Sequence, residues 1–140
     1  MLANKIECDC ATIDLSRLPL VVQTVKDVNP TIKQTQEYLD ALELVLKNYD
    51  GPLYVISDMY AMNYARIKSV VYLGKGIYKL ENLYPRRIKL HTFVRPKWLI
   101  RAVIPVFNVV AHLEEKQKCT NSIEEAIDWI SIQSGLPFYE

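Results

Sequence analysis

The sequence predicts an α/β protein in which a mostly parallel β-sheet has helices packed on it. Two short β-branched or alternating runs near the start suit an antiparallel hairpin. Later apolar runs then alternate with segments whose apolar residues recur at helical spacing, and proline, glycine or capping residues separate them. Strands that alternate with helices imply right-handed crossovers and therefore parallel pairing. The predicted order of elements is ββαβαβαβα.

Length and composition suit a single domain over residues 1–140. Half of the 140 residues are hydrophobic, and a chain of this length buries roughly two-thirds of the surface that it exposes when unfolded. Lys and Arg together number 17 against 16 Asp and Glu, so no strong electrostatic field favours nucleic acid or an anionic membrane. We therefore expect no nucleic-acid partner.

The three cysteines predict a reducing compartment rather than a disulfide framework. Cys8, Cys10 and Cys119 are an odd number, and no secretory signal opens the chain, so we expect a cytoplasmic protein. Cys8 and Cys10 form one pair without a second pair at zinc-like spacing, so we expect no metal site and no cofactor. The thiols are interpreted as small buried hydrophobic groups.

The first elements follow from periodicity and breakers. Residues from Ile6 to Thr12 alternate as a half-buried strand, Leu18-Pro19 forms a turn, and the run from Leu20 to Val25 returns as the second strand. Asn29-Pro30 then predicts the start of a helix. Its apolar stripe contains Tyr38, Leu42, Val45 and Tyr49.

The central strand is predicted from Leu53 to Met59. Gly51 and Pro52 end the preceding helix, and the run that follows is apolar nearly throughout, as expected for a strand covered by helices on both faces. Ligands of open α/β sheets gather beyond the carboxyl ends of the strands. Asp58 stands at that end, so this is the first place to look for a site.

The next helix is expected from about Asn63 to Glu81. It contains Gly74 and Gly76, each unfavourable in a helix by about 1 kcal/mol relative to alanine, which suggests close packing of the helix on the sheet. The alternating run from Arg87 to Val94 predicts a strand nearer an edge of the sheet.

The most apolar segment runs from Trp98 to Val110. It is interrupted and shorter than the roughly 20 residues of a membrane-spanning helix, so we expect a core helix, kinked or split at Pro105. A short strand between Lys116 and Thr120 follows. The last helix begins at Ile123, after a capping-box sequence that opens with Ser122.

These elements resemble the STAS or SpoIIAA-like family, whose fold is that of the anti-sigma-factor antagonists, and in particular its small stand-alone bacterial members. The resemblance spans nearly the whole chain and implies a regulatory module that binds proteins or small ligands. The segments that carry it are Leu53-Tyr54-Val55-Ile56-Ser57-Asp58-Met59, Asn63-Tyr64-Ala65-Arg66, and Cys119-Thr120-Asn121-Ser122-Ile123-Glu124-Glu125-Ala126-Ile127-Asp128-Trp129-Ile130.

One departure from the family bears on function. Phosphorylated members carry an Asp-Ser-Ser-Gly-like step where the helix after the central strand begins, and the region from Asp58 to Ser69 has no such sequence. Ser69 is expected inside the helix and Ser57 inside the strand, where a kinase would reach neither. We therefore expect no phosphorylation switch.

The candidate binding site lies where two parallel strands end. If those strands are neighbours, their loops combine a carboxylate, two cations, a phenol and an indole, which suits a small polar or anionic group or a partner. The candidate residues are Asp58, Met59, Tyr60, Arg95, Lys97 and Trp98. The sequence favours a purely structural alternative. In it, Asp58 caps the following turn, Arg95 forms an ion pair with Asp58, and Trp98 lies in the core.

No catalytic constellation is found in the sequence. Gly74-Lys75-Gly76 lacks the spacing and the ending of a phosphate-binding loop. His91 and His112 have no nucleophile near them in the sequence. The sequence thus predicts a protein that is not an enzyme.

Two functional hypotheses follow. The first is a non-enzymatic cytoplasmic regulatory or protein-interaction module of STAS-like type; the alternative is a binder of a small polar, anionic or lipid-like ligand that uses the strand-end loops and the kinked apolar helix. Nine tyrosines and a half-exposed strand also leave a homodimer open. The sequence names neither the partner nor the ligand.

Overall fold

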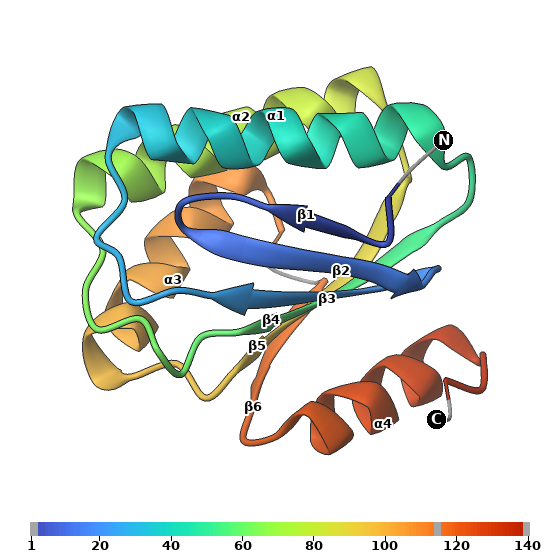
Figure 1. Ribbon diagram of the computed structural model, residues 1–140. Coiled ribbons are helices and arrows are strands. Elements are labelled where there is room, and N and C mark those ends of the chain that lie inside the picture. The colour runs from blue at the N-terminus through green and yellow to red at the C-terminus, as the bar shows by residue number, and fades with distance from the viewer. Residues whose placement is uncertain (1–2, 114–115, 139–140) are drawn as a thin grey trace.

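A computed structural model describes residues 3–113 and 116–138, which form a six-stranded sheet with four helices. The elements run βββαβαβαβα, and the strands lie in the order β1-β2-β3-β4-β5-β6. Helices α1 to α3 cover one face of the sheet and α4 covers the other (Figure 1). The strands are Lys5–Glu7, Ala11–Arg17, Leu20–Val25, Leu53–Asp58, Ile88–Val94 and Gln117–Thr120, and the helices are Ile32–Asn48, Ile67–Leu83, Trp98–Ala111 and Ile123–Ser134.

The predicted fold class is confirmed, with one strand more than expected. β1, β2 and β3 pair antiparallel, and β3 to β6 pair parallel. β4 lies between two parallel neighbours and is buried on both faces, as its continuous apolar run predicted. β5 is the strand next to the β6 edge.

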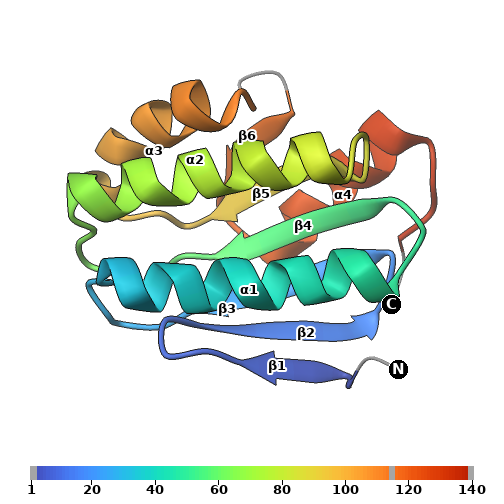
Figure 2. The ribbon, with the colours of Figure 1, turned by 90° about the horizontal axis from the view of Figure 1, so that it is seen from above.

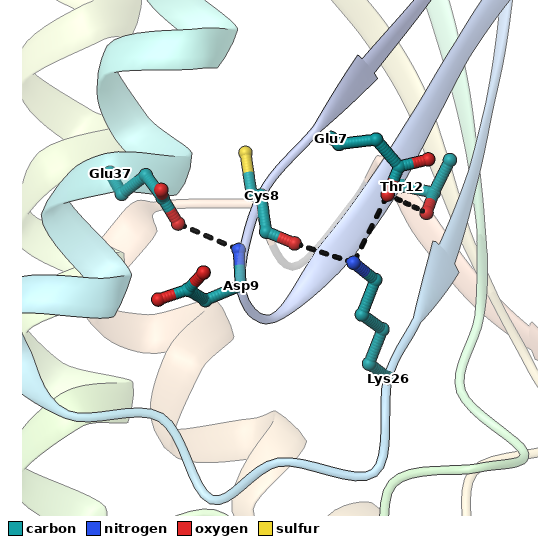
Figure 3. A network of polar contacts seen from close by, with 6 residues as sticks. All are labelled: Glu7, Cys8, Asp9, Thr12, Lys26 and Glu37. Carbon is teal, nitrogen blue, oxygen red and sulfur yellow. Dashed lines mark hydrogen bonds and ion pairs between the residues drawn. The ribbon is translucent and has the colours of Figure 1, made fainter.

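The prediction of a single strand from Ile6 to Thr12 is wrong, because the chain reverses at Cys8 to Cys10 (Figure 3). Both thiols are buried in spite of the reversal, and Ala11 directly after Cys10 is buried as well, so the alternation changes phase at the turn. The Lys26 ammonium donates to the Cys8 carbonyl oxygen at 2.8 Å and pairs with Glu7 at 3.1 Å. The Asp9 amide donates to the Glu37 carboxylate at 2.7 Å, which ties this turn to α1.

Two helices start later than predicted. Thr31, not Asn29, caps α1, in a capping box in which its hydroxyl accepts from the Gln34 amide at 3.1 Å. α2 begins at Ile67, and the segment from Asn63 to Arg66 is not helical. The start of α4 is confirmed: the Ser122 hydroxyl accepts from the Glu125 amide at 3.1 Å.

Helix α3 is continuous through Pro105, so the predicted split does not occur. Pro105 and Arg101 are both exposed, which leaves water able to bond the Arg101 carbonyl that the proline cannot serve. Its buried residues face the sheet and include Ile100, Ile104 and Phe107. Within the described ranges, no helix has both the length and the apolar character needed to cross a membrane.

The two glycines of α2 permit close contact with neighbouring helices rather than with the sheet. A methyl group at Gly74 would lie 2.8 Å from the Val110 side chain of α3, and one at Gly76 would lie 2.3 Å from the end of the Leu39 side chain of α1. α2 thus lies between α1 and α3, as seen from above in Figure 2. The expectation that these positions are glycine because α2 packs closely on the sheet is therefore wrong.

We expect Gly74→Ala to lower the free energy of unfolding by about 1–3 kcal/mol, because the branched Val110 side chain is fixed near its backbone and cannot yield. Gly76→Ala should cost less, since the far end of Leu39 can rotate away. Urea unfolding of both variants and the natural protein measures the difference. A Gly74→Ala protein at least as stable as the natural one would show that the helices do not need this contact.

Candidate functional site

The carboxyl ends of β4 and β5 bring four of the predicted site residues together. Arg95 Nη2 lies 2.9 Å from Asp58 Oδ2, and the other Asp58 oxygen accepts from the Tyr60 amide at 3.2 Å. The Arg95 guanidinium lies 4.7 Å from the centre of the Tyr60 ring, and the Lys97 ammonium lies 5.2 Å from it. Both cations are therefore within cation–π distance of one exposed phenol.

A second contact joins this cluster to the loop before α2. The Lys97 ammonium donates to Asn63 Oδ1 at 2.7 Å, and the Asn63 amide donates to Asp27 Oδ1 at 2.8 Å. Loops after β3, β4 and β5 therefore meet at one edge. We call this cluster, together with Trp98, the strand-end surface: Asp58, Tyr60, Asn63, Arg95, Lys97 and Trp98.

Met59 and Trp98 do not lie where the sequence placed them. Met59 is buried beneath the helices, so it takes no part in the strand-end surface. Trp98 is 76 % exposed at the first position of α3, so the interpretation that assigned it to the core is wrong. The ion pair and the turn cap of that interpretation are present, but an exposed pair of this kind contributes only about 0–1 kcal/mol. That this surface binds anything stays a prediction.

A cavity of about 150 Å³ lies on the other side of Met59, between the sheet and helices α1 to α3. Its walls are almost wholly apolar. Among the residues that line it are Leu42, Val70, Val103, Ile104 and Phe107. The cavity is partly open rather than sealed. Apolar cavities of this volume admit a molecule such as benzene.

Four polar side chains form a continuous hydrogen-bonded chain along the wall of the cavity. The Tyr38 hydroxyl donates to Gln23 Oε1 at 2.5 Å, and Gln23 Nε2 donates to Ser57 Oγ at 2.9 Å. Ser57 Oγ lies 2.8 Å from His91 Nε2. Strand pairing positions these groups, because Gln23 is in register with Ser57, and His91 is in register with Val55, two residues before Ser57.

The hydrogen-bonded chain suits a neutral His91 ring that carries its proton on Nδ1. In that tautomer, Ser57 Oγ accepts from Gln23 and gives its own hydrogen to His91 Nε2, which is then the acceptor. Burial lowers the pKa of His91 from 6.5 to about 4, which keeps the ring neutral at pH 7.

No nucleophile lies near His91 in the sequence, but the fold brings Ser57 to 2.8 Å from it on the adjacent strand. The contact could not be inferred from the sequence, because Ser57 and His91 lie on different strands far apart in the chain. A signal was nevertheless present: Gln23 and Ser57 are single polar residues within otherwise apolar strands, and buried polar groups need partners.

The cysteines and acids offer no metal site in the residues that the structure describes. No group of three or more His, Cys, Asp or Glu side chains lies close enough together there to hold an ion. Cys8, Cys10 and Cys119 are free thiols. Burial raises the pKa of Cys8 to about 11, which disfavours the thiolate form that binds metals.

We expect the buried His91 to make folding sensitive to acid. Between about pH 6.5 and pH 4 the unfolded chain binds a proton on this ring that the folded chain does not. The contribution of His91 to the free energy of unfolding is therefore full above about pH 6.5 and is lost as the pH falls to about 4. The loss amounts to about 3 kcal/mol.

Urea unfolding at about pH 7 and pH 4.5 should therefore show a smaller loss of stability in His91→Phe than in the natural protein. The comparison cancels the contributions of other groups that titrate in the same range. Equal losses in both proteins would mean that the His91 ring is not held neutral by burial.

Comparison with known proteins gives support for the fold. No protein-family model matches the chain, and no curated protein matches it. A solved structure described as the overall structure of SLC26A9, a protein with a STAS domain, is similar over 84% of this chain, with 14% sequence identity and a TM-score of 0.54. The match spans 20% of that protein's chain. Similarity at this level of identity shows the fold alone, and that fold is STAS-like.

Proposed function

We propose that this chain is a non-enzymatic, cytoplasmic regulatory module of STAS-like type, and that it binds a protein partner through the strand-end surface. The observation that carries the proposal is the exposed indole of Trp98 beside two cations stacked on Tyr60. Trp, Tyr and Arg are the residues that most often dominate the binding energy of protein interfaces.

Further exposed apolar side chains extend this surface. Helices α2 and α3 begin at the same edge of the molecule (Figures 1 and 2). Tyr64, just before α2, and Ile67, its first residue, are both about half exposed. Together with Trp98 they give exposed apolar groups at the edge that carries the charged side chains, which supports an interaction site there.

The proposal includes no phosphorylation switch. Ser69 lies in the first turn of α2, closer to the family's phosphoacceptor position than the sequence prediction placed it. Its side chain is nevertheless buried, and its hydroxyl donates to the Pro30 carbonyl oxygen at 2.6 Å. Ser57 is buried as well, inside β4. Neither hydroxyl is presented to a kinase.

We also propose that the protein has no enzyme activity. The Ser57–His91 pair is the feature that could argue against this, because a histidine can activate a serine for nucleophilic attack. A serine activated by histidine needs a base that accepts a proton near neutral pH, and burial lowers the His91 pKa to about 4. In the part of the chain that is described, no carboxylate bonds the second ring nitrogen to orient it. We therefore interpret the pair as a structural hydrogen bond.

A fluorophosphonate probe should leave Ser57 unlabelled after prolonged incubation with the folded protein. Mass spectrometry of the intact chain and of its peptides detects any adduct. Denatured protein serves as the control for background reaction. A covalent adduct on Ser57 that forms only in the folded protein, and that His91→Phe abolishes, would refute the non-enzymatic proposal.

Partner binding is tested by affinity capture from cells that make the protein, with two matched variants. Trp98→Ala should lower recovery of the partner by roughly tenfold or more, the size of effect seen at interface hot spots. Ile132→Ala is the control, because Ile132 is equally exposed but lies on α4, on the opposite face.

Equal recovery with both variants would place the binding site elsewhere. Recovery of no partner, together with turnover of a metabolite by the purified chain, would contradict the proposed function itself.

A further inference from the structure

We propose that the cavity beneath α1, α2 and α3 binds a neutral, mainly apolar small molecule about the size of one six-membered ring, whose hydrogen-bond acceptor contacts Nδ1 of His91. This site is separate from the strand-end surface and does not depend on partner binding there.

The volume sets the size of the ligand. At about 150 Å³, the cavity is far larger than the space that one buried water needs, and it matches cavities that admit a single aromatic ring. The walls come from three helices and the sheet, so no single side-chain movement fills the space.

The walls set the polarity of the ligand. Aliphatic and aromatic side chains such as Val70, Val103 and Phe107 cover most of the surface, and no Lys, Arg, Asp or Glu is among the described residues that line the cavity. A charged ligand would lose its hydration without gaining a counter-ion, which is strongly unfavourable. A neutral molecule is therefore favoured over an anion.

The hydrogen-bonded chain supplies the one directional contact. With Tyr38, Gln23 and Ser57 donating in sequence, the last hydrogen reaches His91 Nε2 and leaves the Nδ1 hydrogen on the opposite side of the ring. Among the described residues, no acceptor bonds Nδ1. His91 is among the residues that line the cavity, and it is only partly buried. A carbonyl or ether oxygen in the ligand would satisfy this donor.

The test uses cyclohexanone and methylcyclohexane, which share size and shape but differ in their acceptor, as probes of the full chain in NMR titrations. Both should shift methyl signals of cavity residues saturably. In His91→Phe, which keeps a ring of similar volume, the affinity for cyclohexanone relative to methylcyclohexane should fall roughly fivefold to tenfold. An unchanged ratio overturns the assignment of His91, and no saturable shift with either probe overturns the site.

Two further measurements keep the proposal testable if His91→Phe folds poorly. In the natural protein, the imidazole ¹⁵N signal of His91 Nδ1 should shift with cyclohexanone and stay unmoved with methylcyclohexane; identical behaviour with both overturns the contact. Val103→Phe, which fills the cavity, should abolish binding of both probes. Val109→Phe on the exposed side of the same helix should retain it, and equal effects of the two variants count against the cavity as the site.

Discussion

The parallel pairing of β3, β4 and β5 is the constraint on which the rest of the structure depends. It places Gln23, Ser57 and His91 side by side on one face, where each bonds to the next. A shift of register by one residue would move these polar groups to the face that packs on α4 and would leave them unpaired. The polar chain therefore favours this alignment of the central strands.

The same strands produce two distinct candidate sites, one inside the protein and one at its surface. On the inside, α2 lies close to α1 and α3 because of Gly74 and Gly76, yet the helices leave a cavity above the polar chain. At the surface, the loops after the strands gather charged and aromatic groups around Tyr60. Met59 follows Asp58 and Met62 precedes Asn63, and both line the cavity, so the two sites adjoin.

Much of the fold could be predicted, because burial and capping leave local signals. The continuous apolar run of β4 and the capping sequence at Ser122 both predicted what the structure has. The reversal at Cys8 to Cys10 was missed because both thiols are buried, as they would be on one face of a single strand. The cap of α1 was misplaced because Asn29 and Thr31 are both suitable capping residues, and only the Thr31–Gln34 contacts distinguish them.

The candidate sites also have some features that the sequence predicts and others that it does not. The meeting of Asp58 with Arg95 was predictable, because the carboxyl ends of neighbouring parallel strands share an edge. The Ser57–His91 contact was not, since it depends on the register between strands that are joined by a long crossover helix. The exposure of Trp98 was missed for a different reason: an apolar residue at the start of an apolar helix gives no local sign of the face on which it lies.

A crystal structure determined under xenon pressure tests most directly whether an open, apolar cavity lies above the polar chain. The account predicts xenon between Phe107, Val70 and the His91 ring, with the Gln23–Ser57–His91 hydrogen bonds unchanged. A crystal without xenon at this place, in which the side chains of α2 and α3 fill the space, would contradict it.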